Sequence, residues 1–248
     1  MILKFLNKHK YAENKFAKKL KKQKQKYIEI IKPELSKMQR QLKKKEVSFL
    51  HSGHLGDLIN SLPLIKQISK KSKCNLYIEV GKQTDNFKVT KEFYLSKGGV
   101  EKILPLLKKQ NYINHLAIYQ KQKININLNF FRTLDINFNI DSVRWYSHLV
   151  GIHPPLELPY IKVDKHKKFR NKIVIVRSLR RQNNLISYKF LNKYKNILFI
   201  GLKTEYLSLK KDIKNLSFYD CKNFLEMAEI IKGCKLFIGN LSFGYALA

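Results

Sequence analysis

The sequence predicts an α/β protein with two Rossmann-like lobes, each built on a parallel sheet, behind a basic helical arm. Apolar runs of strand length alternate with longer segments of helical periodicity, an order typical of βαβ units and parallel sheets. This alternation begins at residue 46, is interrupted by the lysine-rich stretch 165–168, and then starts again. The expected parts are a helical N-terminal arm over 1–45, a first lobe over 46–164 and a second lobe over 170–248.

The composition is that of a folded protein with a large positive charge. Of the 248 residues, 44% are hydrophobic and 12% aromatic, which is enough for real cores and argues against global disorder. The 50 Lys and Arg oppose 18 Asp and Glu, so the formal net charge is +32. Such a charge favours phosphorylated small molecules, nucleic acid or an anionic membrane as partners. A compositional preference for Lys, Asn and Ile would produce the same charge, so the charge alone selects none of these partners.

The cysteines predict neither a metal site nor a disulfide framework. Cys74, Cys221 and Cys234 lie far apart, form no CxxC pair and have no histidine at ligand spacing. The opening residues are too short for a signal peptide, and no apolar run approaches the length that spans a membrane. We therefore expect a cytoplasmic protein in a reducing compartment, with no metal ion and no resident cofactor.

Residues 1–45 form a distinct basic segment. It holds 16 Lys and Arg against three Glu, and 16 − 3 leaves a charge of +13. Pro33 predicts a break or kink in a helix whose apolar residues recur at roughly helical spacing. These apolar residues include Phe16, Leu20, Tyr27, Ile30 and Ile31. The segment is compatible with a solvated basic helix, or with a peripheral anchor on the inner face of an anionic membrane.

Both lobes show short apolar strands separated by helices. In the first lobe we expect strands at 47–51, 75–80 and 115–119, and helices at 58–68, 98–110 and 141–150. In the second lobe we expect strands at 172–176, 196–201 and 234–239, and a helix at 224–232. Residues 120–140 have no assignable pattern. Residues 245–248 open a helix that stops within its first turn, so we expect the second lobe to be cut short before its natural end.

The first candidate site is the turn that follows the strand at 47–51. Gly53, His54 and Gly56 lead into a helix, and the glycines let the backbone turn tightly beside a ligand. Asp57 follows at the carboxyl end of the expected parallel sheet, where open α/β folds place their sites. A carboxylate there can accept a proton from an attacking hydroxyl. The alternative is structural, because an aspartate at a helix start can act as its N-cap.

The second lobe carries two further candidate turns. Three arginines within five residues follow the strand at 172–176, where they can hold a diphosphate through forked hydrogen bonds or belong to a solvated loop. The turn after 234–239 joins small polar residues to a helix start, which makes a cradle of backbone N–H groups for an anion. The candidate donor-binding residues are Arg177, Ser178, Arg180, Arg181, Asn183, Gly201, Gly239, Asn240, Ser242, Phe243 and Gly244. Ser242 is equally suited to cap the helix that follows it.

The order of these turns resembles glycosyltransferase family 9, the heptosyltransferase-like enzymes with the GT-B fold. In the first lobe, Gly56-Asp57-Leu58-Ile59 with Leu62-Pro63-Leu64 resembles the opening pattern of that family. In the second lobe, residues 224–231 and then 235–240 resemble its late helix and the strand before the donor-binding loop. The resemblance covers the chain from residue 46 to residue 248, and the matches lie at the two ends of that span.

This resemblance implies transfer of a hexose or heptose from a nucleoside-diphosphate donor to a hydroxyl on a glycan or glycolipid, as in lipopolysaccharide biosynthesis. It implies inversion by direct displacement without a metal, with the nucleotide sugar as co-substrate. Asp57 would be the base, Arg177 and Ser178 would lie near the diphosphate, and residues 239–244 would contact the donor. Gly53, His54 and Gly56 would form the loop on the acceptor side.

Two alternatives remain open. The late loop has Leu241, Phe243 and Ala246 where the family commonly has an acid, a glycine and a histidine. A relative that binds a nucleotide sugar but no longer transfers it would fit these departures. A basic nucleic-acid-binding protein would fit the charge, although the sequence shows no helix-turn-helix or RNA-binding signature.

Overall fold

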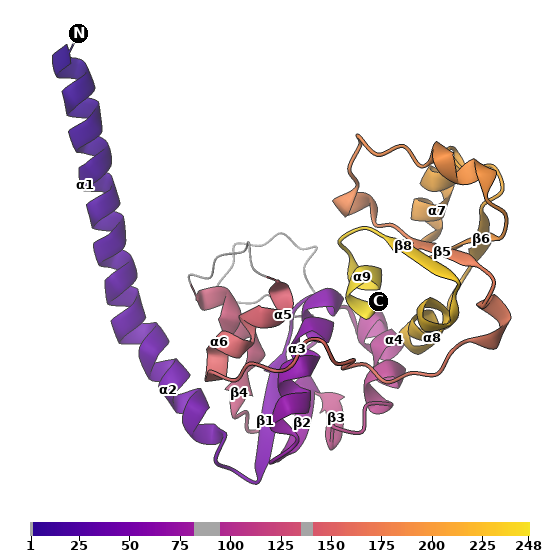
Figure 1. The fold of residues 1–248 in the computed structure, drawn as a ribbon. Helices are drawn as coiled ribbons and strands as arrows, with labels where there is room; N and C mark the ends of the chain where they lie inside the picture. Colours follow the sequence, from indigo (N-terminus) through magenta and orange to yellow (C-terminus); the bar gives the residue numbers. More distant parts are fainter. Residues whose placement is uncertain (1, 82–94, 135–140) are drawn as a thin grey trace.

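The computed structural model describes residues 2–81, 95–134 and 141–248, with side chains from residue 8 onward (Figure 1). Within these residues the strands form two four-stranded sheets, and every strand pair is parallel. Helices pack around each sheet, and a long N-terminal helix projects from the first lobe. The predicted α/β class, with two parallel-sheet lobes and a preceding helix, is confirmed.

The first lobe is built on sheet A, whose strand order is β3-β2-β1-β4. Its strands are β1 (Glu46–His51), β2 (Lys73–Ile78), β3 (His115–Ile118) and β4 (Ile126–Asn127). Its two crossover helices are α3 (Leu55–Ile68) and α4 (Lys97–Lys108). β1 lies inside the sheet, so Val47, Phe49 and Leu50 are buried, which explains why most of the predicted strand is apolar. The end of β1 therefore opens at the middle of the carboxyl edge of the sheet.

The segment without an assignable pattern, 120–140, closes the sheet beside β1. Its described part, 120–134, contains β4 and the 3₁₀ helix η3 (Leu128–Thr133), and 135–140 lie outside the described residues. The helix predicted over 141–150 is instead two short helices, α5 (Ser142–Trp145) and α6 (Ser147–Val150). α6 ends at Gly151, whose φ of 69° is a conformation that glycine adopts without strain.

The second lobe is built on sheet B, whose strand order is β7-β6-β5-β8. Its strands are β5 (Ile173–Val176), β6 (Ile197–Ile200), β7 (Ser217–Tyr219) and β8 (Leu236–Gly239). Its α-helices in the described part of the chain are α7 (Lys203–Lys210), α8 (Phe224–Gly233) and α9 (Phe243–Leu247). The sequence did not predict α7 or β7, because α7 buries a single leucine and β7 has three residues.

Both faces of sheet B are covered, because alternate residues of β5 point to opposite sides. Val174 belongs to an apolar cluster with Ile230 of α8 on one face. Ile175 belongs to a second cluster with Leu209 of α7 on the other face. The loops that follow β5 and β8 are thus held at their bases by two packed layers.

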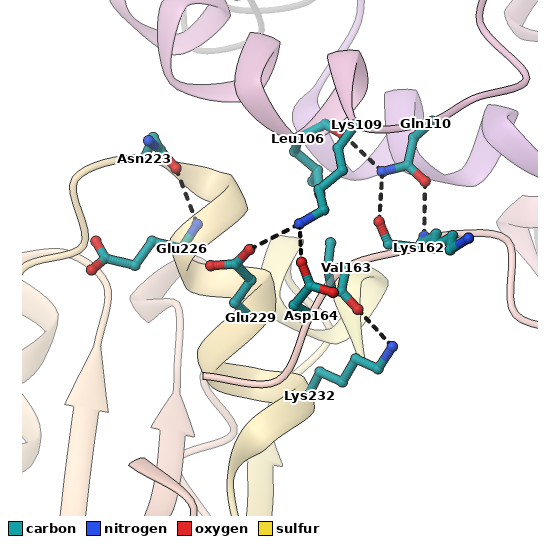
Figure 2. Close-up of polar contacts among 10 residues, drawn as sticks. All are labelled: Leu106, Lys109, Gln110, Lys162, Val163, Asp164, Asn223, Glu226, Glu229 and Lys232. Carbon is teal, nitrogen blue, oxygen red and sulfur yellow. Dashed lines mark hydrogen bonds and ion pairs between the residues drawn. The ribbon is translucent and has the colours of Figure 1, made fainter. Parts of the chain in front are cut away.

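The lobes meet through their helices and through a polar cluster. α4 contacts α8, and α3 contacts α9. Figure 2 shows Lys109, just after α4, between Asp164 and Glu229 of α8; its Nζ lies 3.5 Å from Glu229 Oε1. Gln110 accepts the N–H of Lys162 at 2.8 Å and donates to the carbonyl oxygen of Lys162 at 3.2 Å. The connection between the lobes is therefore tied to α4 and α8.

The N-terminal arm is one long helical rod. It consists of α1 (Ile2–Lys26), the π-helix η1 (Tyr27–Ile31) and α2 (Lys32–Gln41). The irregularity predicted at Pro33 takes the form of this π-turn directly before it, because a proline has no N–H to donate and its ring crowds the preceding turn. α2 packs on the first lobe, with Met38 buried, whereas α1 continues beyond it (Figure 1).

Candidate active site

Asp57 lies in the first turn of α3, which follows β1 at the carboxyl edge of sheet A. The N-cap residue of α3 is His54, and no side chain makes a capping hydrogen bond there. The alternative that Asp57 serves as an N-cap is therefore wrong, since Asp57 sits three residues inside that position. Its Oδ2 instead forms an ion pair with Nη2 of Arg132 at 2.5 Å.

Arg132 is the residue of this candidate site that the sequence analysis missed. It comes from η3, and its guanidinium lies over the Phe131 ring, 4.4 Å from the ring centroid. A Cβ placed on Gly53 would lie 2.3 Å from Nη2 of Arg132, so a glycine at 53 is what lets this side chain reach Asp57. Nη1 of Arg132 is buried without a hydrogen-bond partner among the described residues.

A buried hydrogen-bond chain fixes the first turn of α3. Nδ1 of His51 accepts the N–H of Gly53 at 3.1 Å, so the ring proton belongs on Nε2, which lies 3.2 Å from the Tyr146 hydroxyl. Tyr146 in turn donates to the backbone carbonyl of Asp57 at 2.8 Å. Burial, followed by the charge of Arg132, holds the pKa of His51 well below its ordinary value. A neutral imidazole is the form that this chain of bonds requires.

Arginines from the second lobe influence this carboxylate. Burial raises the pKa of Asp57, and this effect exceeds the lowering by Arg132, Arg180 and Arg181. Burial, followed by the charges of Arg180, Arg132 and Arg181, lowers the pKa of His54 to about 4. Arg180 and Arg181 lie in the 3₁₀ helix η5 (Leu179–Arg181) after β5. The structure therefore brings these two predicted donor-side residues toward the predicted base.

Arg177, the third predicted arginine of this turn, points toward α7. It is 2% exposed, and its Nη2 donates to the hydroxyl of Ser208 in α7 at 2.9 Å. Its Cζ lies 5.6 Å from the centroid of the Tyr188 ring, and its Nε is buried without a hydrogen-bond partner in the described part of the chain. In this structure Arg177 thus braces the base of the loop against α7, whereas Arg180 and Arg181 occupy its exposed end.

The two candidate turns of the second lobe are tied together. Oδ1 of Asn240 accepts the N–H of Ser178 at 2.9 Å, and its Nδ2 donates to the carbonyl oxygen of Ser178 at 2.7 Å. A Cβ on Gly244 would lie 2.5 Å from Cγ1 of Val176, so α9 packs directly on the end of β5. A Cβ on Gly239 would lie 3.4 Å from the carbonyl oxygen of the same valine. The tips of β5 and β8 therefore act as one unit.

The remaining candidates have local roles. Ser242 is the N-cap residue of α9 but makes no capping bond, and its hydroxyl is buried without a partner among the described residues. Asn183 accepts the N–H of Leu185 at 2.9 Å in a turn next to the arginines. Gly201 follows β6 with a φ of 143°, a conformation that side chains disfavour. Phe243 packs edge-on against Phe224, with ring centroids 4.6 Å apart.

The last acceptor-side candidate, Gly56, has no heavy atom within 4 Å of a built Cβ. Of the two glycines in this loop, Gly53 alone would meet Arg132 if it carried a Cβ. The sequence signal that could have found Arg132 is that it is the one basic residue between residues 124 and 143. An arginine with no other basic residue near it in the sequence is a candidate for a specific partner.

The arrangement resembles that of a solved glycosyltransferase. A family 9 glycosyl transferase from Veillonella parvula DSM 2008 aligns with a TM-score of 0.52 at 12% identity, over 84% of this chain and 78% of that chain. The chain has the fold of this glycosyltransferase. Structures of the E. coli heptosyltransferase WaaC with ADP-2-deoxy-2-fluoro heptose and with ADP align at TM-scores of 0.42 and 0.41, with 10% and 11% identity. They cover 82% of this chain in both cases, and 84% and 83% of theirs.

The comparison confirms, at the level of fold, the resemblance predicted from the sequence. No protein-family model matches the sequence, and no curated protein matches it significantly. The likeness to the Veillonella enzyme therefore lies in the fold, at a sequence identity of 12%.

Proposed function

We propose that this chain is a family 9 glycosyltransferase that moves a hexose or heptose from a nucleoside-diphosphate donor to a hydroxyl on a glycan or glycolipid. The observation that carries the proposal is the partly buried carboxylate of Asp57 at the carboxyl edge of one lobe, influenced by Arg180 and Arg181 of the other. A base in one lobe and cations in the other suit a reaction in which a proton leaves the acceptor and negative charge develops on the donor. The shared fold with a family 9 enzyme supports the same assignment.

The proposed reaction is a direct displacement with inversion. The acceptor oxygen attacks the anomeric carbon, and its proton passes to Asp57. The bond between the anomeric carbon and the diphosphate oxygen breaks, and the nucleoside diphosphate leaves with the bonding electron pair. Arg180 and Arg181 would stabilise that departing charge without a metal ion, because guanidinium groups bind phosphate oxygens through paired hydrogen bonds. The raised pKa of Asp57 favours its role as a base.

The donor would contact the joined tips of β5 and β8. The Ser242 hydroxyl is a buried group without a partner in the described structure, and a phosphate oxygen would satisfy it. The double hydrogen bond between Asn240 and Ser178 keeps the two turns at a fixed separation. Hydrogen-bonding groups that are held in place before the reaction lower the cost of stabilising charge in the transition state.

Calorimetric titration with ADP, UDP, GDP and CDP at physiological salt tests the donor site, with inorganic pyrophosphate as the reference ligand. We expect one nucleotide to bind more tightly than pyrophosphate. Arg180→Ala should weaken that binding by about 10-fold or more, since a charge-assisted hydrogen bond contributes about 1.5–3 kcal/mol. Equal, weak binding to all five ligands, unaffected by Arg180→Ala, would show that net charge alone attracts them.

A second candidate function is nucleotide-sugar binding without transfer. The ion pair between Asp57 and Arg132 favours it, because a carboxylate held by a guanidinium at 2.5 Å is less available as a base. Release of nucleoside diphosphate from a panel of nucleotide sugars, with sugar acceptors present, separates the two functions. An enzyme should lose at least about 1,000-fold in turnover in Asp57→Asn while it still binds the nucleotide. Tight binding with no turnover in the wild type would favour the binding protein.

A further inference from the structure

The outer part of α1 is a strongly cationic helix that nothing in the described structure neutralises. Between residues 8 and 24 it carries eight lysines and one acidic residue, Glu13. Glu13 lies 3.2 Å from His9, and no described carboxylate forms an ion pair with any of these eight lysines. α1 extends away from both lobes (Figure 1), so its whole circumference is available to a partner.

One side of this helix is apolar and exposed. Phe16 is 62% exposed and Leu20 is 48% exposed, and a spacing of four residues places them on the same side. Tyr27 continues that side seven residues further on and is also exposed. Lys19 and Lys24 flank this stripe, since Lys19 lies three residues from Phe16 and Lys24 lies four residues from Leu20. Long lysine side chains at such positions can lay their methylene groups along an apolar layer and keep their ammonium groups in its polar boundary.

The lysines also repel one another within the helix. Lys15 and Lys19 lie four residues apart, as do Lys18 and Lys22, and neighbours at this spacing face each other. Like charges so placed weaken a helix that has no tertiary contacts. A negatively charged surface removes this penalty, so it would stabilise α1 as well as attract it.

The place where α1 leaves the protein links it to the candidate active site. α2 leads down to the start of β1, so the helix before it runs up toward the carboxyl edge of sheet A and past it (Figure 1). Nζ of Lys26 donates to the carbonyl oxygen of Thr133 at 2.8 Å. Thr133 is adjacent in sequence to Arg132, the partner of Asp57. The exposed part of α1 therefore begins at the edge of the lobe that carries Asp57.

We propose that α1 docks on an anionic lipid bilayer, with Phe16 and Leu20 in the interface and Lys19 and Lys24 against the headgroups. The combination of a polar, lysine-rich face with aromatic and aliphatic residues on the other side is that of a helix lying in a membrane surface. No described helix is long and apolar enough to cross a bilayer. The contact is therefore peripheral, and it stands whether or not the proposed sugar transfer is correct.

Other occupants fit less well. A second copy of α1 would bring two lysine-rich helices together with one carboxylate each, Glu13, to pair them. Nucleic acid would engage the lysines, but it would leave the Phe16–Leu20 stripe in water, and α1 has no arginine to recognise phosphate or base edges bidentately. A bilayer satisfies both the charge and the apolar stripe.

Co-sedimentation of the full chain with vesicles tests the charge requirement. We expect binding to phosphatidylcholine vesicles that contain phosphatidylserine, and none to pure phosphatidylcholine, at physiological salt. Lys19→Glu/Lys24→Glu should reduce the partition coefficient more than about 100-fold, because each unit of charge near an anionic surface contributes a factor of about five and the two reversals change four units. The matched control is Lys70→Glu/Lys71→Glu, which makes the same charge change at exposed positions between α3 and β2. Equal losses in both pairs would mean that net charge alone binds the vesicles, and would overturn the proposal.

A second pair of variants tests the apolar stripe. Phe16→Ser/Leu20→Ser should reduce vesicle binding about 10-fold or more. Leu185→Ser/Leu207→Ser, at exposed positions in the second lobe, should leave it unchanged. Far-ultraviolet circular dichroism should show more helix with anionic vesicles than without. Unchanged vesicle binding in Phe16→Ser/Leu20→Ser, or tighter binding to duplex DNA than to vesicles, would overturn the proposal in favour of a polyanion site.

Discussion

A methyl group at Gly53 is the sharpest test of how the candidate base is held. In Gly53→Ala, the new Cβ would lie 2.3 Å from Nη2 of Arg132 and 3.0 Å from its Cζ and Nη1. These atoms are the far end of a flexible side chain, so the protein can fold if the guanidinium swings away from Asp57. The ion pair of Asp57 and Arg132, whose side chains are 21% and 11% exposed, would then be lost.

The loss of this ion pair should be the largest contribution to the change in the free energy of unfolding of Gly53→Ala. A hydrogen bond to a charged group contributes about 1.5–3 kcal/mol. Replacing a glycine by alanine raises the free energy of unfolding by about 0.4–1 kcal/mol, because it lowers the conformational entropy of the unfolded chain. We therefore expect the free energy of unfolding to fall by about 1–2 kcal/mol. Without the guanidinium, the pKa of Asp57 should rise further, because Arg132 is the largest of the charges that lower it.

Urea denaturation and a carbon-13 NMR titration of labelled aspartate measure both effects. Gly56→Ala is the matched control, since a Cβ there meets no heavy atom within 4 Å. It lies in α3, so alanine should raise the free energy of unfolding by about 0.5–1 kcal/mol and leave the pKa of Asp57 unchanged. If the two alanine variants behave alike, Gly53 does not control the position of Arg132 and the reasoning fails.

Three further outcomes follow from the same structure. The pKa of His54 is about 4 in the folded protein and 6.5 in the unfolded chain, so its contribution to stability is complete above pH 6.5 and is lost as the pH falls toward 4. Between pH 7 and pH 4.5 the free energy of unfolding should fall less in His54→Gln than in the wild type, by roughly 1–2 kcal/mol after allowance for partial exposure; parallel pH profiles would contradict this. Asn240→Ala removes both bonds to Ser178 and should lower the free energy of unfolding by about 1–2 kcal/mol in urea titrations; a value within about 0.5 kcal/mol of the wild type would mean that the tie is dispensable. Lys109→Met should speed proteolysis of the connection between the lobes, whereas Lys108→Met, at an exposed neighbouring position, should not; equal cleavage rates would show that the ion pairs with Lys109 do not hold the lobes together.

The fold was largely predictable because its central strands are buried on both faces. β5 and β6 are unbroken runs of apolar residues, β1 has apolar residues at 47, 49 and 50, and each strand was expected within one or two residues of its observed bounds. Elements at the periphery left weaker patterns. β4 has two residues, and α7 buries a single leucine. Neither element therefore has an apolar periodicity that distinguishes it from the neighbouring residues.

The candidate site was only partly predictable. The turns that carry Asp57, Arg180 and Arg181 were recognisable because glycines and clustered arginines at strand ends have a direct physical meaning. The conformation of Arg177 was not, because its position next to Ser208 depends on the packing of α7. The first arginine of such a cluster gives no sign in the sequence of which way its side chain turns.

The sequence by itself determined the two parallel-sheet lobes, the basic N-terminal helix and the place of Asp57 at the end of β1, since these follow from local periodicity and turn chemistry. Tertiary structure alone decided the partner of that carboxylate. Arg132 lies 75 residues further along the chain and reaches Asp57 across Gly53 because η3 folds back beside β1. Pairing at such a separation depends on which strands become neighbours, and that choice is made by the packing of the whole lobe.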